Sequence, residues 1–159
     1  MPRAKVTARV RNLAALELVN IGLIGWLVFG AFDAPLSPTN LVGFGATTLL
    51  LAVGAAYWLV KLNQLHAGLG RPPLIGVFRA LQLVCTLGLA AGLVMIAAGF
   101  GSSPGRFVPG LVLYLLAVAE YVNYFHWQLM YDNRADIARL LRTGRLSRAH
   151  LHTDLRKTG

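Results

Sequence analysis

Ionisable and amide side chains gather near the end of the last apolar stretch of the chain. Glu120, Asn123, His126 and Gln128 occur within sequence that otherwise resembles a membrane-spanning helix. A carboxylate at membrane depth costs roughly 2.5–3.5 kcal/mol on insertion scales, so each such group is a candidate functional site. A carboxyl group in apolar surroundings can also hold a proton near neutral pH and exchange it. These residue types therefore permit either proton exchange or a polar contact that locks helices together.

The helical repeat predicts which of these side chains can meet. At about 100° per residue, Glu120, Asn123 and Tyr124 share one face, whereas His126 lies roughly 120° away from Glu120. We therefore expect the partners of Glu120 to come from other helices. The candidate partners are cations: Lys61, His66 and Arg79.

Polar residues of all four apolar stretches fall toward the same side of the predicted membrane. A path for ions needs solvating groups along its whole length, and here the opposite half contains few polar side chains. The pattern favours a polar pocket with an apolar floor over an open channel. The predicted intramembrane polar cluster comprises Glu17, Asn20, Arg79, Gln82, Glu120, Asn123 and His126.

Composition places these residues in a membrane protein. The chain has 159 residues, of which 56% are hydrophobic and 13% charged. Four continuous apolar stretches each reach the roughly 20 residues that cross a hydrocarbon layer about 30 Å thick. They are too long and too uniform for barrel strands, so helices are expected. The predicted spans are residues 13–32, 41–62, 78–100 and 108–131.

The predicted fold is an all-α integral membrane protein. Short connections predict that sequential spans are antiparallel neighbours, which gives an up-down bundle of four transmembrane helices. Gly68, Pro72 and Pro73 are expected to end any helix between the second and third spans. The domain boundaries are a transmembrane domain over residues 1–131 and a cytoplasmic tail over residues 132–159.

The distribution of charge predicts the orientation. The net charge is +9, and fourteen of the fifteen Lys and Arg residues fall on one side of the predicted spans, with Arg106 alone on the other. The positive-inside rule then places both termini in the cytoplasm of a multi-pass protein of the cell membrane. The basic excess is expected to attract anionic lipids of the inner leaflet, and nucleic-acid binding is only a minor alternative.

The tail is predicted to form one or two short, basic, amphipathic helices. Ser147 is a candidate N-cap, and Leu151 and Leu155 are one turn apart. Two alternatives stay open, a tail that lies on the inner leaflet and a tail that binds a cytoplasmic protein. The candidate residues for lipid or partner binding are Arg134, Arg139, Arg142, Arg145 and Arg148.

Cofactor and metal sites are not expected. The lone Cys85 cannot build a disulfide or a cysteine metal site, and two histidines, His66 and His126, are too weak a signature for haem. The sequence contains no phosphate-binding loop and no hydrolase or zinc-protease motif. Gly88 and Gly92 form a small-xxx-small pair that supports close helix packing more than it specifies dimerisation. A homo-oligomer is expected because four thin helices offer little area to bury charges within one protomer.

Two functions from different classes follow. The first is a membrane protein without catalytic activity that serves assembly or partner binding. The alternative is a proton-coupled transporter of small cationic or amphipathic solutes, in which Glu120 or Glu17 exchanges the proton. An enzyme acting on a lipid head group would need a nucleophile or metal site that the sequence does not supply.

Overall fold

The protein is helical throughout the described part of the chain. The computed structural model describes residues 3–69, 74–129, 142 and 146–156. No strand occurs in these ranges, where the only β-type pairing is an isolated bridge between Trp127 and Arg148. The elements are α1 (Arg3–Gly25), the π-helical segment η1 (Trp26–Ala31), α2 (Pro38–Ala67), α3 (Ile75–Ala98), α4 (Pro104–Phe125) and α6 (His150–Arg156).

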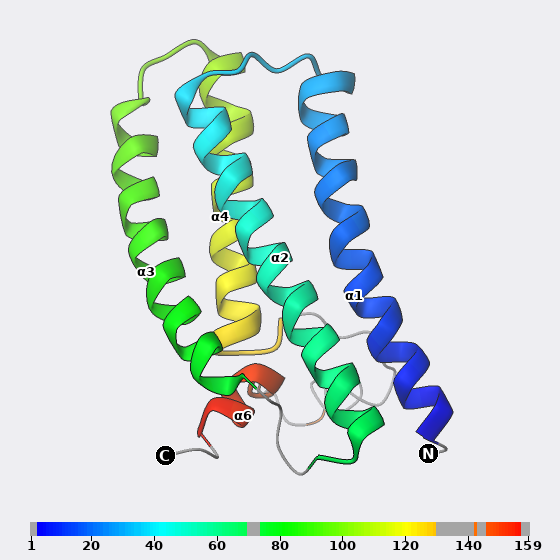
Figure 1. Ribbon diagram of the computed structural model, residues 1–159. Coiled ribbons are helices and arrows are strands. Elements are labelled where there is room, and N and C mark those ends of the chain that lie inside the picture. The colour runs from blue at the N-terminus through cyan, green and yellow to red at the C-terminus, as the bar shows by residue number, and fades with distance from the viewer. Residues whose placement is uncertain (1–2, 70–73, 130–141, 143–145, 157–159) are drawn as a thin grey trace.

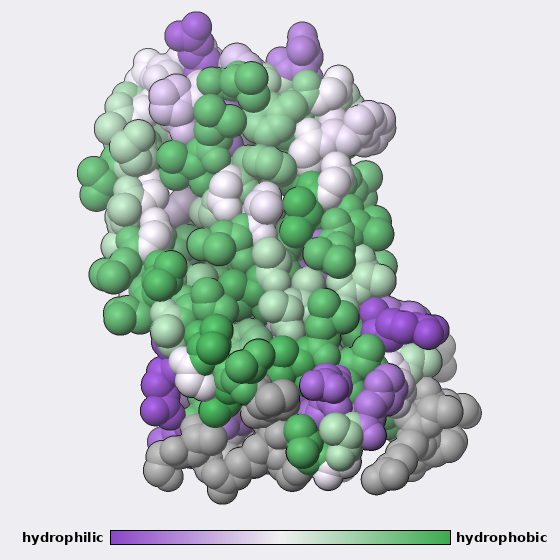
Figure 2. Space-filling model, in the orientation of Figure 1, coloured by the Kyte–Doolittle hydropathy of each residue, from purple (hydrophilic) through white to green (hydrophobic). Residues whose placement is uncertain are grey.

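Four helical segments are long and apolar enough to cross a membrane. They are Val6–Ala31, Pro38–Ala67, Ile75–Ala98 and Pro104–Phe125. Large apolar side chains cover much of their outer surface, and Figure 2 shows hydrophobic residues across the middle of the molecule and hydrophilic ones at its two ends. Such an apolar surface is unfavourable in water and suits a lipid solvent. The prediction of a helical multi-pass membrane protein is confirmed to this extent.

Helix α2 is the central element. It packs against α1, α3 and α4, and its most extensive contact is with α4 (Figure 1). Contacts pair Gly43 with Gly110 and Gly54 with Tyr124, so residue numbers rise together and α2 and α4 run parallel. The arrangement therefore depends more on two helices that are not consecutive in the chain than on sequential neighbours.

The beginnings and ends of α2 follow from local sequence. Ser37 lies at the N-cap of α2, where its hydroxyl accepts from the backbone N–H of Asn40 at 3.3 Å, and Pro38 occupies the first turn. Proline suits that position because its missing N–H would have no helical partner there. Gly68 ends the helix in the left-handed conformation with φ 65°, as the glycine and proline signals predict.

Helix α4 ends at Phe125, earlier than the predicted limit at residue 131. The side-chain oxygen of Asn123 accepts from the backbone N–H of Leu129 at 2.8 Å, which holds a turn instead of a further helical turn. Beyond the helix, the N–H of Gln128 donates to the carbonyl of Ser147 at 2.9 Å. An asparagine that competes with helical hydrogen bonds thus turns the chain toward its C-terminal segment.

A backbone-to-backbone approach joins α2 and α4 near their first turns. A Cβ atom added at Gly43 would overlap the carbonyl of Gly110, and a Cβ atom at Gly110 would overlap the backbone of Thr39. Only glycine at these two positions permits such proximity. One turn further along, the hydroxyl of Thr47 donates to the carbonyl of Leu113 at 2.7 Å.

Asn40 completes the hydrogen bonding of a helix interrupted by proline. Pro109 lies inside α4 and has no N–H to offer the carbonyl of Gly105. The fully buried amide of Asn40 donates to that carbonyl at 3.0 Å and accepts from the N–H of Gly110 at 2.8 Å. A side chain of α2 therefore takes over backbone bonds that α4 cannot make for itself.

We predict that Asn40→Ala destabilises the protein through Pro109. Three backbone groups would lose a partner, at about 1–3 kcal/mol for each one left buried and unsatisfied. Two of them, the Gly105 carbonyl and the Gly110 N–H, flank Pro109, and the third is the carbonyl of Pro35. The measurement is thermal unfolding in detergent, followed by far-UV circular dichroism, with the exposed Asn63→Ala on the same helix as control.

The same substitution should cost less in a Pro109→Ala background, where residue 109 can donate to Gly105 again. An equal loss of stability in both backgrounds would show that Asn40 acts independently of the proline.

Candidate functional site

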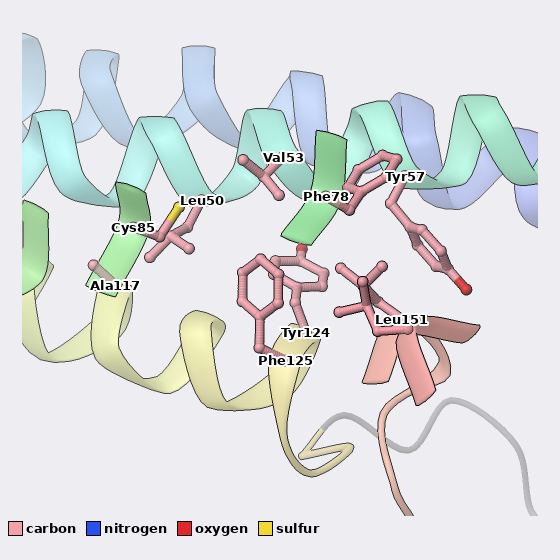
Figure 3. Close-up of a cluster of buried hydrophobic side chains, with 10 residues drawn as sticks. Leu50, Val53, Tyr57, Phe78, Cys85, Ala117, Tyr124, Phe125 and Leu151 are labelled. Carbon is pink, nitrogen blue, oxygen red and sulfur yellow. The ribbon is translucent and has the colours of Figure 1, made fainter. Parts of the chain in front are cut away.

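One polar contact bridges α1 and α4 across α2. The hydroxyl of Tyr124 donates to Oε1 of Glu17. The side chain of Tyr124 passes Gly54 of α2, where an added Cβ atom would overlap the phenol. Figure 3 shows the Tyr124 hydroxyl pointing from α4 toward α2. A glycine in α2 thus opens the space through which the first and fourth helices meet.

Glu120 lies beside this contact. The amide of Asn123 donates to its Oε2 at 3.4 Å, and the Tyr124 hydroxyl also lies close to its carboxyl group. A hydroxyl has only one proton to donate, so it can satisfy one carboxylate at a time. The two half-buried glutamates therefore share a single phenol, and we name Glu17, Glu120, Asn123 and Tyr124 the glutamate cluster.

Two of the three cations named as candidate partners of Glu120 have other contacts. Lys61 pairs with Asp154 at 2.7 Å, and Arg79 donates to the carbonyl of Leu155 at 3.3 Å. His66 is exposed near the end of α2. Sequence spacing predicted the face that Glu120 shares with Asn123 and Tyr124, whereas the contact of this face with Glu17 depends on packing at Gly54.

The other members of the predicted cluster lie elsewhere. Asn20 is half-buried on α1, and Gln82 is half-buried on α3, where its backbone carbonyl accepts from Thr86 at 2.8 Å. His126 follows α4, and its ring lies 5.4 Å from that of Tyr121 and 6.3 Å from that of His152. Burial lowers the pKa of His126, and His152 and Arg148 lower it further.

A second polar contact involves a residue that the sequence reasoning missed. Asp154 of α6 is buried and accepts from the hydroxyl of Tyr57 at 2.9 Å and from the ammonium of Lys61 at 2.7 Å. Tyr57 and Lys61 are one turn apart on α2, and this spacing, with an acidic residue in a basic tail, was the available signal. We name Tyr57, Lys61 and Asp154 the tail cluster.

The C-terminal segment packs against the helices, in contrast to one expectation for the tail. Leu151 and Leu155 are buried with Tyr57, Phe78 and Phe125, and Figure 3 shows Leu151 directed into this apolar cluster. The two leucines therefore pack inside the protein instead of facing a leaflet. Helix α6 begins at His150. Ser147 lies three residues before this start, whereas an N-cap directly precedes the first helical residue, so Ser147 is not the N-cap of α6.

The predicted lipid- or partner-binding arginines are only partly described. Arg142 is exposed, and Arg148 lies with its guanidinium carbon 4.1 Å from the centre of a Trp127 ring. Arg134, Arg139 and Arg145 lie outside the described residues, so their role stays a prediction. A cation above an aromatic face is an attractive contact that holds Arg148 close to α4.

An apolar groove lies between α2 and α3. It encloses about 340 Å³, and its walls include Gly45, Leu49, Gly88 and Gly92. A Cβ atom added at Gly45 or Gly88 would have nothing within 4 Å, whereas one at Gly92 would meet Tyr114. Of the predicted glycine pair, Gly88 therefore faces open space and Gly92 is packed against Tyr114.

Comparison with protein-family models, with curated proteins and with solved structures finds no match for this chain. Among the described residues, no group of three or more His, Cys, Asp or Glu side chains could hold a metal ion.

We predict that Gly54→Ala destabilises the protein because the added methyl group displaces Tyr124 from Glu17. The matched control is Gly22→Ala on α1, where the methyl group has open space and lies away from the groove between α2 and α3. Replacing an unconstrained helical glycine by alanine should stabilise by about 0.5–1 kcal/mol, so the two substitutions should shift the melting temperature in opposite directions. A melting temperature that rises for both would contradict the assigned role of Gly54.

Proposed function

We propose that the protein is a non-enzymatic, multi-pass protein of the cell membrane that serves assembly, with a second copy of itself or with another protein. Its helices would form an up-down bundle with both termini in the cytoplasm. The single observation that carries the proposal is that the polar side chains of the helices join one element to another. Tyr124 joins α4 to α1, Asn40 joins α2 to α4, and Asp154 joins α6 to α2.

The proposed orientation rests on charge. Arg106 lies in the first turn of α4, and this end of the molecule carries the α1–α2 and α3–α4 connections (Figure 1). The remaining Lys and Arg residues fall, by sequence, toward the opposite ends of the spans. The first turns of α1 and the whole of α6 lie together at the opposite end (Figure 1). The positive-inside rule assigns that end to the cytoplasm, where anionic lipids or a cytoplasmic protein would meet the basic tail.

The groove between α2 and α3 supports association with a second copy. Its open glycines, Gly45 and Gly88, let another backbone approach closely, and such approach stabilises helix pairs in a solvent as apolar as the helices. The groove is apolar along its length, which fits a transmembrane helix of the same chain. A homo-oligomer would also cover part of the apolar surface of α3.

We predict that Gly88→Leu shifts the protein toward the monomer, because the larger side chain fills the groove. The equilibrium constant for dissociation should rise at least about tenfold, which corresponds to roughly 1.4 kcal/mol. Native mass spectrometry from detergent would measure the stoichiometry. Gly22→Leu is the matched control, since Gly22 also has open space around it but lies on α1, away from the groove.

A wild-type protein that is monomeric in detergent and in bilayers would overturn the homo-oligomer. If Gly22→Leu dissociates the protein and Gly88→Leu does not, association would be assigned to α1.

The glutamate cluster favours a second candidate function, a proton-coupled transporter of small cationic or amphipathic solutes. Glu17 and Glu120 face one phenol that can donate to only one of them at a time. The other carboxyl group can take a proton or a cation, which is the exchange that such a transporter needs. The supporting geometry lies between α1 and α4, whereas α1 otherwise packs mainly against α2.

We predict for this alternative that tetraphenylphosphonium, a lipophilic cation, releases protons from the purified protein in weakly buffered detergent. Up to about one proton per chain is expected, because the two carboxyl groups share one site. Glu17→Gln should abolish the release without unfolding the protein. Asp33→Asn, which removes an exposed carboxylate from the α1–α2 connection, should leave it unchanged. The absence of proton release from the wild type would count against transport.

A further inference from the structure

The tail cluster is a preformed set of donors. Tyr57 is only 1% exposed, and its hydroxyl donates to Asp154, which is 8% exposed. Lys61 approaches the same carboxylate oxygen at 2.7 Å. Both donors come from successive turns of α2, so the backbone of α2 fixes their spacing independently of α6.

Neighbouring aromatic rings hold the phenol of Tyr57 in place. Its ring lies 5.8 Å from Phe78 in an edge-to-face arrangement and 5.1 Å from Trp58. These contacts come from α2 and α3 alone. These two rings constrain the Tyr57 side chain from α2 and α3, and Leu151 of α6 packs in the same cluster (Figure 3).

A third donor lies next to the first two. Arg79 of α3 donates to the backbone carbonyl of Leu155, the residue that follows Asp154. Phenol, ammonium and guanidinium groups thus converge on one turn of α6. A carboxylate offers two oxygens, whereas a phosphate group offers three and pairs well with guanidinium and ammonium groups. Asp154 meets two of these three donors, and Arg79 meets the neighbouring carbonyl of Leu155.

The segment that supplies Asp154 is short. Helix α6 has seven residues, which is too short for stability without docking. One of its polar anchors is the contact between Nδ1 of His152 and the carbonyl of Phe125 at 2.8 Å. Nε2 of the same ring is buried without a hydrogen-bond partner in the described structure, and this reduces the stability of the docked state.

We propose that Tyr57, Lys61 and Arg79 form a binding site for a phosphate group, and that Asp154 occupies this site as an internal substitute. Binding of phosphate displaces the carboxylate and releases α6. Lys61 lies six residues before the end of α2, roughly 9 Å along the helix. This site goes beyond the proposed function, and its test is independent of oligomeric state and of proton release.

A phosphate group can come from an anionic lipid or from solution, and hydrogen exchange separates the two sources. The full chain is placed in nanodiscs of phosphatidylcholine alone, of phosphatidylcholine with phosphatidylglycerol, or of phosphatidylcholine with inorganic phosphate at matched ionic strength. Exchange is followed in a peptide covering residues 146–156. Faster exchange with phosphatidylglycerol only identifies a lipid ligand, and faster exchange with both identifies the phosphate group itself.

We predict that Asp154→Asn increases the sensitivity to phosphate. Removing the internal competitor should lower the half-maximal phosphate concentration at least about tenfold, because apparent affinity scales with the fraction of competent sites. Thermal stabilisation of Asp154→Asn by inorganic phosphate provides a second readout, and Lys61→Gln added to this variant should abolish it. Arg156→Gln, an exposed change in the same helix, should behave as the wild type.

Exchange of residues 146–156 that is equal in all three nanodisc preparations would overturn the proposal. Stabilisation of Asp154→Asn by phosphate that persists when Lys61 is replaced would also overturn it, because the anion would then bind elsewhere.

Discussion

The close approach of α2 and α4 is the contact on which the other contacts depend. Two glycines, Gly43 and Gly110, remove the side chains that would separate the helices. This proximity brings Asn40 within reach of the carbonyl that Pro109 leaves without a donor. The proline is tolerated because a neighbouring helix satisfies the freed backbone groups, as is common in membrane helices. Neither the proline nor the asparagine would be stable in the interior without the other.

The same parallel pairing determines where polar side chains meet further along the helices. Past Thr47, the α2 backbone again lacks a side chain at Gly54, and Tyr124 crosses there to reach Glu17. Beyond this point α2 presents Tyr57 and Lys61, which bind Asp154. One helix thus supplies, in order, the partner of a proline, the passage for a phenol and the counter-charge for the C-terminal segment. These particular polar groups find their partners within the chain, as an apolar solvent requires.

The four long helices could be predicted from sequence because their length and apolar composition satisfy the membrane requirement locally. The face shared by Glu120, Asn123 and Tyr124 was also predictable, since it depends only on the helical repeat. The partner of Tyr124 was not, because it depends on the absence of a side chain at Gly54.

The remaining differences come from contacts between distant parts of the chain. Short connections predicted that sequential helices are neighbours, but they did not predict that the largest contact joins α2 to α4. The basic composition of the tail suggested a leaflet-bound or partner-binding segment, and it did not predict that buried Asp154 and Leu151 hold α6 against the other helices. Composition describes the average character of a segment, and docking was determined by two of its residues.

The aromatic contacts of the C-terminal segment have an optical consequence. The chain contains three tryptophans, and two of them touch this segment: Trp58 lies 6.0 Å from the ring of His150, and Trp127 lies beneath Arg148. Trp26, in η1, is largely exposed at the opposite end of the molecule. Intrinsic fluorescence therefore divides into two emitters that sense whether the segment is in place and one that does not. The native protein carries its own reporter and reference without any added label.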